Sequence, residues 1–265
     1  MHLDIILRTH YQSSKNNSNL VRICGPDRKE MILRCLISLV NAINNCNLLP
    51  INLVILDDHS DSDIIDEYQK ILKKAQCSVD FVNLEVTGIN LPCFEQAKRA
   101  SESTGLVYMV EDDYLHEPNA INSLITAFYT LDHNLKQKVA LYPFDCPFRY
   151  VNPEPSLILY DGTRYWRGIK QTTFVIFSHS ELFKNFFHLF KEMSLGMPHV
   201  YEGETINLMY KDVVTQTGEI MAFCPIPSVA YHLGYQEPAR ILTDHLNWES
   251  LWNSIDYKPV ASNQK

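Results

Sequence analysis

The stretch Leu106-Val107-Tyr108-Met109-Val110-Glu111-Asp112-Asp113 decides how this chain is expected to fold. Its first five residues are apolar, and a short apolar run without polar alternation is typical of a strand that is buried on both faces. Three carboxylates follow directly. Adjacent negative charges in a poorly solvated place repel one another, and hard divalent cations bind oxygen ligands. The stretch therefore predicts a buried strand that ends at a metal site, although an acidic loop that only caps the next helix is an alternative.

A second pair of carboxylates ends an earlier expected strand. Asp57 and Asp58 follow the apolar residues 53–56 and precede His59-Ser60-Asp61. Ligands of parallel α/β sheets bind beyond the carboxyl ends of the strands. A carboxylate there could accept a hydrogen bond from a nucleobase N–H, but Asp and Ser also favour simple turns and helix N-caps. Together, the two acidic strand ends predict one site along one edge of a sheet.

Strand-like and helix-like segments alternate through the first half of the chain. Strands are expected at 3–7, 51–56, 79–86 and 106–110, and helices at 27–43, 64–72, 90–103 and from 118 onward. This alternation favours a mostly parallel α/β sheet. Asp27 with Glu30 three residues later forms a capping box, which predicts where the first helix begins.

The second half contains short strand candidates between proline-rich and aromatic loops, which favours mixed or antiparallel additions to the sheet. The candidates are 139–142, 157–160, 172–177, 220–223 and 228–231, with helices at 180–193, 204–212 and 246–252. We expect a single catalytic domain over residues 1–235 and a loosely attached C-terminal extension over 236–265. Residues 1–115 would form the nucleotide-binding half of the domain and residues 116–235 the acceptor half.

Composition and the N-terminus narrow the class of protein. The chain has 265 residues with ordinary globular composition, and its net charge of −8 argues against a nucleic-acid partner. Its seven cysteines form no C-x-x-C pair, which disfavours zinc-ribbon and redox functions and favours a reducing compartment. The first residues show no signal-peptide pattern, and no apolar stretch is long enough to span a bilayer. We expect a cytoplasmic protein and leave a peripheral membrane contact open.

Three further features carry candidate chemistry. His232, after a short strand and close to Gly234, is a candidate metal ligand, although a lone histidine is more often structural. Glu202 and Glu204 are candidates for a general base near an acceptor hydroxyl, or are simply acids favoured at a helix start. The run 164–170, Arg-Tyr-Trp-Arg-Gly-Ile-Lys, offers aromatic faces for sugars and guanidinium groups for phosphates, or is a surface hairpin with one buried Trp. P-loop, Rossmann and nucleophile-elbow motifs are absent from the sequence.

The order of these motifs resembles the GT-A glycosyltransferases, especially the family 2-like group. The match covers roughly residues 3–235 by analogy. It includes the first strand with Thr9, the Ile55-Leu56-Asp57-Asp58-His59-Ser60 motif, the later Glu111-Asp112-Asp113 and the late His232. The resemblance implies a GT-A type three-layer sandwich with a mostly parallel central sheet. It also implies a hexosyltransferase-type enzyme that uses a nucleoside-diphosphate sugar, with a UDP-sugar as the expected donor.

The resemblance also implies roles for individual residues. Asp58 would contact the base with support from Asp57, and Asp113 would bind Mn²⁺ or Mg²⁺ together with His232. Asp112 or Glu111 would touch ribose, metal or sugar. Thr9, at the end of the first strand, and Arg167, by its guanidinium chemistry, are further candidates for contacts with the donor. Glu204 or Glu202 would be the base of an inverting displacement.

Two positions depart from the family pattern. His59 replaces the usual glycine after the acidic pair, and Thr205 follows Glu204 where the family has Glu-Asp. The second departure leaves the base open between the two glutamates.

The sequence thus predicts a metal-dependent glycosyltransferase with a glycan, lipid-linked or protein acceptor. One rival is a nucleotidyltransferase, disfavoured because residues 8–19 lack the glycines of a phosphate-binding loop. Another is a non-catalytic binder of nucleotide or carbohydrate on a decayed GT-A frame.

Overall fold

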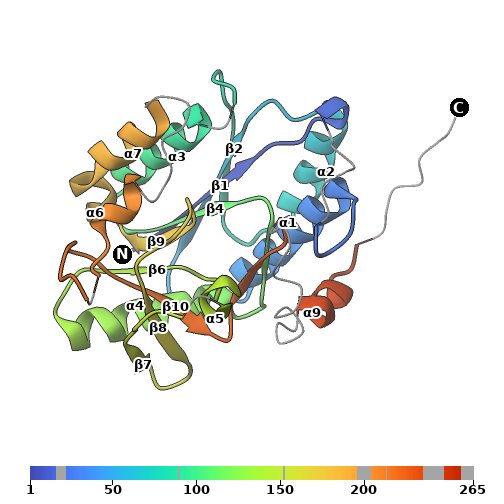
Figure 1. Cartoon of the computed structure of the whole chain (residues 1–265). Coiled ribbons are helices and arrows are strands. Elements are labelled where there is room, and N and C mark those ends of the chain that lie inside the picture. Colours follow the sequence, from blue (N-terminus) through green and yellow to red (C-terminus); the bar gives the residue numbers. More distant parts are fainter. Residues whose placement is uncertain are drawn as a thin grey trace, which may run out of the picture.

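A nine-stranded sheet with the strand order β3-β2-β1-β4-β9-β6-β10-β8-β7 forms the centre of the molecule (Figure 1). The computed structural model describes residues 1–15, 22–88, 90–151, 153–195, 204–212, 214–234 and 248–257. In this sheet β8 and β9 run against all the other strands, so the sheet is mostly parallel in direction. The strands are β1 (Leu3–Thr9), β2 (Ile51–Asp57), β3 (Ser78–Asn83), β4 (Leu106–Glu111), β6 (Val139–Leu141), β7 (Ile158–Tyr160), β8 (Tyr165–Ile169), β9 (Ile176–His179) and β10 (Met221–Ile226).

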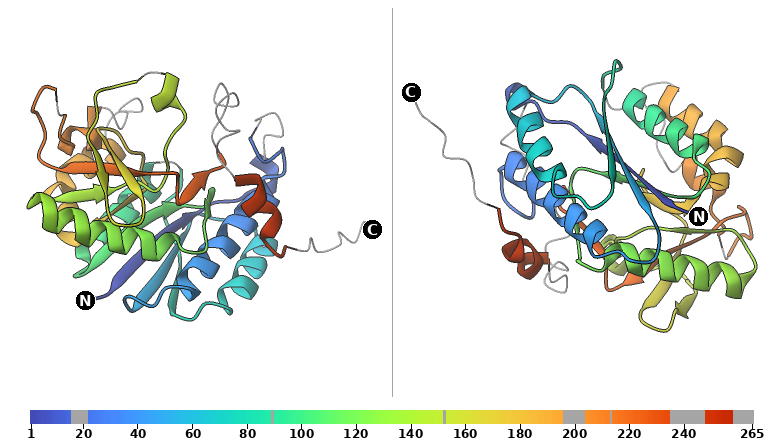
Figure 2. Two further views of the ribbon diagram at one scale, coloured as in Figure 1. Left: turned by 90° about the horizontal axis from the view of Figure 1, so that it is seen from below. Right: turned by 180° about the vertical axis from the view of Figure 1, so that it is seen from behind.

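Helices cover both faces of the sheet and make a three-layer α/β sandwich (Figures 1 and 2). One face carries α1 (Arg28–Asn44), α2 (Ser62–Leu72) and α4 (Ala120–Leu135), and the other carries α3 (Asn90–Glu102), α6 (Ser180–Asn185) and α7 (Phe187–Leu195). Shorter elements are η1 (Ser13–Lys15), α5 (Phe148–Val151), η3 (Ile206–Met209) and α9 (Trp248–Ser254). The mostly parallel three-layer architecture expected from the GT-A resemblance is confirmed.

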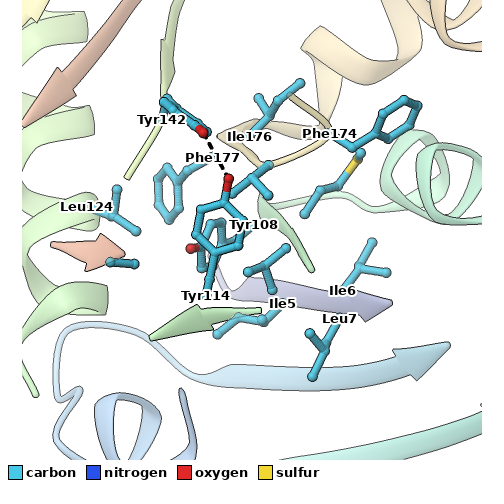
Figure 3. Close-up of a cluster of buried hydrophobic side chains, with 14 of the residues drawn as sticks. Ile5, Ile6, Leu7, Tyr108, Tyr114, Leu124, Tyr142, Phe174, Ile176 and Phe177 are labelled. Carbon is cyan, nitrogen blue, oxygen red and sulfur yellow. Dashed lines mark hydrogen bonds between the residues drawn. The ribbon is translucent and has the colours of Figure 1, made fainter. Parts of the chain in front are cut away.

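The strand that begins the acidic stretch lies at the centre of the core. Residues 106–110 are completely buried, as the unbroken apolar run predicted. Figure 3 shows Tyr108, Tyr114 and Tyr142 packed among aliphatic side chains, with the hydroxyl groups of Tyr114 and Tyr142 joined by a hydrogen bond of 2.9 Å. Buried tyrosines need such partners because an unsatisfied hydroxyl in the core is costly.

A separate two-stranded sheet is decisive for the site. β5 (Tyr114–His116) pairs antiparallel with β11 (Ala230–His232), so that His232 lies opposite Tyr114. No strand was predicted at 114–116. This small sheet brings the late histidine back to the acidic strand end.

Most predicted elements are confirmed, with three corrections. The predicted helix at 204–212 is wrong: only the 3-10 turn η3 forms among those residues, because Asn207 Oδ1 accepts a hydrogen bond from the Thr172 amide and Tyr210 bridges to Ile220. The predicted helix at 180–193 is divided into α6 and α7 at Phe186. The predicted strand at 172–177 begins later, at Ile176, as β9.

The described part of the C-terminal extension is attached to the domain. Arg34 of α1 donates hydrogen bonds of 3.0 Å to the carbonyl oxygens of Trp252 and Ile255. Its guanidinium carbon also lies 4.7 Å from the centre of the Trp252 ring, a cation–π distance. Among the described residues, the helices are all too short or too polar to cross a bilayer.

Candidate active site

The ends of three parallel strands meet at one edge of the sheet. β1 pairs with β2 and with β4 in a register that sets Thr9 beside Asp57 and Arg8 beside Glu111. A cavity of about 570 Å³ lies beyond these ends. It is lined by Arg8, Thr9, His10, Gln12, Arg28, Asp58, His59, Thr87, Gly88, Glu111, Asp112 and Asp113. We call it the donor cavity. It contains members of both acidic motifs, which the sequence analysis expected to share one site.

His232 reaches this cavity through β11. Its Nε2 atom lies 3.0 Å from Asp113 Oδ2, and its ring stacks on Tyr114 at 4.8 Å with an angle of 9° between the planes. The Leu233 amide donates a 2.9 Å hydrogen bond to the Asp113 carbonyl, which fixes the two chain segments together. Gly234 belongs to the same contact, since a Cβ atom there would come within 2.2 Å of Asp113 Oδ2. The short distance between Asp113 and His232 therefore depends on the absence of a side chain at residue 234.

Each carboxylate of the acidic triplet has its own cationic partner. Glu111 pairs with Arg8, Asp112 with Arg28 at 3.5 Å, and Asp113 with His232. Asp112 also accepts a 3.0 Å hydrogen bond from the backbone amide of His10. The mutual repulsion from which a metal ion was inferred is therefore relieved by the chain itself. A metal ion is therefore not needed to relieve this repulsion, contrary to what the sequence suggested.

Burial and pairing move the pKa values of these groups in different directions. Burial raises the pKa of Glu111 and of Asp112 above the ordinary range. Burial also raises the pKa of Asp113, but the adjacent His232 outweighs it and the net shift is downward. For His232, burial lowers the pKa and Asp113 raises it by more, so the net shift is upward. The Asp113–His232 pair is thus stabilised as carboxylate and imidazolium.

Asp57 and Asp58 have different surroundings. Asp57 is 1% exposed and accepts hydrogen bonds from the Thr9 hydroxyl at 2.8 Å, the Ser60 hydroxyl at 2.6 Å and the Ser60 amide at 2.9 Å. These bonds occupy both of its oxygens and fix the turn. Asp58 lines the donor cavity, with one oxygen 3.1 Å from His59 Nδ1. Asp57 thus positions the loop, and Asp58 is the carboxylate presented to a ligand.

The departure at His59 has a backbone explanation. His59 has a φ of 56°, in the left-handed region that glycine adopts most easily. Histidine is one of the few other residue types found there more often than average. The turn therefore has the backbone conformation that a glycine would adopt, while the histidine adds an imidazole to the cavity wall.

Other predicted site residues lie elsewhere. Arg167 lines a different cavity, beside α5, where it pairs with Asp145 at 3.6 Å. The alternative interpretation of its segment, a hairpin with one buried Trp, is correct: β7 and β8 pair, and Trp166 is completely buried. Glu204 is exposed and does not line the donor cavity, and Glu202 lies outside the described residues.

The sequence analysis missed the basic groups of the donor cavity. Arg8, His10 and Arg28 all line it, and Arg28 also donates a 2.8 Å hydrogen bond to the His10 carbonyl. A signal was present, because Arg8 and His10 flank Thr9 at the end of β1 and Arg28 opens α1 next to its N-cap Asp27. A polyanionic ligand beside three carboxylates needs such cations.

The residues fit a divalent cation only in part. Within the described ranges, no group of three or more His, Cys, Asp or Glu side chains is arranged to hold a metal ion. Asp113 Oδ1, however, is buried and has no hydrogen-bond partner among these residues. Asp113 and, after loss of its proton, His232 therefore offer two ligands, and oxygens of a bound ligand or water would have to complete the shell.

Comparison with solved structures finds enzymes of nucleotide-sugar chemistry. TarS of S. aureus is 14% identical, with a TM-score of 0.49 and coverage of 97% of this chain and 41% of TarS, so the chain spans less than half of that protein. The galactosyltransferase LgtC, solved with donor and acceptor sugar analogues, is 12% identical with a TM-score of 0.47 and coverage of 97% of both chains. A UDP-glucose pyrophosphorylase is 10% identical, with a TM-score of 0.47 and coverage of 94% of this chain and 99% of the enzyme.

The sequence itself matches no protein-family model and no curated protein. Because the three TM-scores are below 0.5, the function proposed below rests on the geometry of the donor cavity.

Proposed function

We propose that the protein is a glycosyltransferase that moves a sugar from a nucleoside-diphosphate sugar, a UDP-sugar in our proposal, to a hydroxyl group of an acceptor. The observation that carries the proposal is the donor cavity, where the carboxylates of Asp58 and Asp113 and two arginines surround one space at the strand ends, with His232 in contact with Asp113. Such a space offers hydrogen-bond acceptors to a nucleobase and cationic groups to a diphosphate. It also offers a carboxylate and a neighbouring imidazole to a metal ion. These are the chemical demands of a nucleotide-sugar donor.

The residues divide between the parts of the donor. Asp58 would accept a hydrogen bond from the N–H of the nucleobase, with Asp57 and Thr9 holding its loop. Arg8 and Arg28 would face the diphosphate, since guanidinium groups bind phosphate oxygens with two parallel hydrogen bonds. Arg8 Nε is buried and has no hydrogen-bond partner among the described residues. A phosphate oxygen that reached it would satisfy that donor.

Asp113 and His232 would hold Mn²⁺ or Mg²⁺, which would supply a Lewis acid for the leaving diphosphate. Asp113 Oδ1, the unpartnered oxygen, would be the first ligand atom. Glu111 and Asp112 would keep Arg8 and Arg28 in place and contact the ribose or the sugar. Glu204 or Glu202 would accept the proton of the acceptor hydroxyl in an inverting displacement.

All seven cysteines are free thiols. Free thiols support a reducing compartment, so we place the protein in the cytoplasm.

The direct test combines binding with product analysis on the full chain. UDP and a set of UDP-sugars are titrated with and without Mn²⁺, and hydrolysis and transfer are followed with and without EDTA. We expect metal-dependent binding and release of a nucleoside diphosphate. Release of pyrophosphate would identify a nucleotidyltransferase instead, and binding without turnover over a broad acceptor set would identify a non-catalytic binder.

Residue roles are tested by matched substitutions. Asp113→Ala should abolish the effect of Mn²⁺ on UDP binding, whereas Asp66→Ala, at an exposed position of α2, should leave it unchanged. Full transfer activity of Asp113→Ala in the presence of EDTA would rule out the metal role. Glu202→Gln and Glu204→Gln, assayed for transfer and for donor binding, would show which glutamate is the base.

A further inference from the structure

A second cavity, of about 140 Å³, lies in the second half of the chain beside α5. Its floor includes Gly168 and Ala222 of the paired strands β8 and β10. Its charged wall residues are Arg149, Glu154, Arg167, Lys170, Lys211 and Asp212. Cations thus outnumber acids there, although the whole chain has a net charge of −8. We call this space the basic cavity.

Arg167 is the anchored cation of the basic cavity. Asp145, which is 3% exposed, lies 3.6 Å from its Nη1, and the Tyr150 ring centre lies 4.4 Å from its guanidinium carbon. The Tyr150 hydroxyl donates a hydrogen bond to Asp145 as well. This packing fixes the orientation of the guanidinium group, so little side-chain entropy would be lost when it binds an anion.

The other cations are less completely neutralised. Lys170 lies between Glu154 at 3.1 Å and Asp212 at 3.4 Å. Lys211 forms no ion pair with any residue that the structure describes. Arg149 donates one hydrogen bond of 2.9 Å to the Gln171 carbonyl, but its Nε is buried and lacks a partner in the described parts of the chain. Two cations are therefore available to a negatively charged ligand.

One exposed aromatic side chain lines the basic cavity, and two more lie on the hairpin whose strand β8 contributes to its wall. Phe148 lines it and is 54% exposed, and Tyr160 and Tyr165, each 56% exposed, contact each other on the neighbouring hairpin at 5.1 Å. Solvent-exposed aromatic faces suit the apolar faces of sugar rings. The combination of cations in a cavity, Phe148 in its wall and two exposed tyrosines on the adjoining hairpin fits a carbohydrate that carries a negative group.

The basic cavity is also connected to the donor cavity. Phe144 packs edge-on against the His232 ring at 6.4 Å, and the next residue, Asp145, holds Arg167. Contacts from His232 to Phe144, and from the next residue Asp145 to Arg167, thus join the two cavities, and an acceptor whose anionic group is bound by Arg167 would extend along them towards the Asp113–His232 pair.

We propose that the basic cavity is an acceptor subsite that binds the anionic group, a phosphate or a carboxylate, of a negatively charged glycan. This inference rests on the proposed function and specifies its acceptor class. It also changes the expected role of Arg167, from a contact of the donor phosphate to a contact of the acceptor.

The test measures binding of small probes to the full-length protein by isothermal titration or by NMR. The probes are glucose 6-phosphate, glucuronic acid, glucose and inorganic phosphate. We expect at least one of the two anionic sugars to bind more tightly than glucose and more tightly than inorganic phosphate. Preference for glucose 6-phosphate would identify a phosphorylated glycan, and preference for glucuronic acid a uronic-acid glycan. Equal binding of glucose and both anionic sugars would overturn the proposal.

Substitutions locate the binding. Lys211→Ala and Arg149→Ala should each lower the affinity for the preferred anionic sugar by about fivefold or more, because each substitution removes a charged hydrogen-bond donor. Lys98→Ala, at an exposed position of α3, is the matched control and should change nothing. Unchanged affinity in both cavity variants would overturn the assignment.

Binding of UDP, measured in the same samples, separates this inference from the proposed function. Variants of the basic cavity should keep wild-type affinity for UDP. If the wild type binds no nucleotide but still binds the anionic sugar through Lys211, the proposed function fails and the anion site stands.

Discussion

The donor cavity and the basic cavity differ in how their charges are paired. In the donor cavity, each carboxylate of the triplet has a cationic partner that comes from a distant part of the chain. In the basic cavity, Asp145 holds Arg167, but Lys211 and the Nε of Arg149 have no such partner among the described residues. The charges of the donor cavity are therefore already paired before a ligand binds, and a donor must replace some of these ion pairs with its own contacts. The basic cavity has a surplus of positive charge that an anion can neutralise.

The largest effect is expected from breaking a balanced pair. Arg8→Met leaves Glu111 without a cation at the end of β4, where an unpaired buried charge costs about 3–5 kcal/mol. The free energy of unfolding, measured in urea, should fall by about this amount. The double variant Arg8→Met/Glu111→Gln should recover most of the loss. If the single variant is as stable as the wild type, Arg8 does not stabilise the charge of Glu111.

A pH effect of similar size should come from the wall behind the donor cavity. His116, fully buried in β5, has a pKa lowered to about 4 by burial, and its ring nitrogens contact the Tyr108 hydroxyl at 2.9 Å and the Tyr114 carbonyl at 3.0 Å. The folded state favours the neutral form of the His116 ring. The stabilisation that this ring contributes is therefore fully present above pH 6.5 and is lost as the pH falls towards 4. The loss should amount to ~3 kcal/mol.

Two variants separate the contribution of His116 to the pH dependence of stability from that of other groups that titrate in acid. His116→Gln should make the free energy of unfolding less dependent on pH between 6.5 and 4 than in the wild type. His133→Gln, at an exposed position of α4, should keep the wild-type dependence. Parallel pH profiles for His116→Gln and the wild type would contradict the prediction.

Catalysis should depend on the Asp113–His232 pair. Asp113→Asn keeps the size of the side chain but removes its charge, and we expect transfer to fall about 100-fold or more, the loss typical when an electrostatic contact in an active site is removed. The rate of transfer under saturating donor is the measurement. A loss below about threefold would show that the pair is structural only.

The smallest effect is expected in the basic cavity. Tyr150→Phe removes one hydrogen bond to Asp145, and the free energy of unfolding should fall by ~1 kcal/mol. Affinity for UDP should stay unchanged, because Tyr150 does not line the donor cavity. A change in UDP affinity would mean that the two cavities are not independent.

The donor cavity was more predictable than the basic cavity for a physical reason. Fully apolar runs such as 106–110 indicate buried strands locally, and the ends of parallel strands must share one edge. Asp58 and Asp113 could therefore be placed together from the sequence. His232, 119 residues from Asp113, was placed beside it only through the family resemblance. Arg8, 103 residues from Glu111, was not placed, because such distant pairs depend on the register of the folded chain.

The basic cavity depends on contacts that leave no periodic pattern. Arg167 was expected at the donor because the aromatic and basic run allowed a phosphate contact, but the hairpin directs it towards Asp145. Residues 204–212 were expected to be helical because local propensity allowed it, but Asn207 and Tyr210 have tertiary partners. In both places, contacts with residues distant in the sequence determined the local structure.

The attachment of α9 to α1 gives the molecule an internal optical reporter. The Trp252 indole lies over Arg34, on the same helix whose first residue, Arg28, faces the donor cavity. A ligand that shifts the first turn of α1 should change the electric field at the Trp252 indole. The wavelength of its fluorescence emission should then shift as well. Tryptophan fluorescence should thus follow occupancy of the cavity without a label.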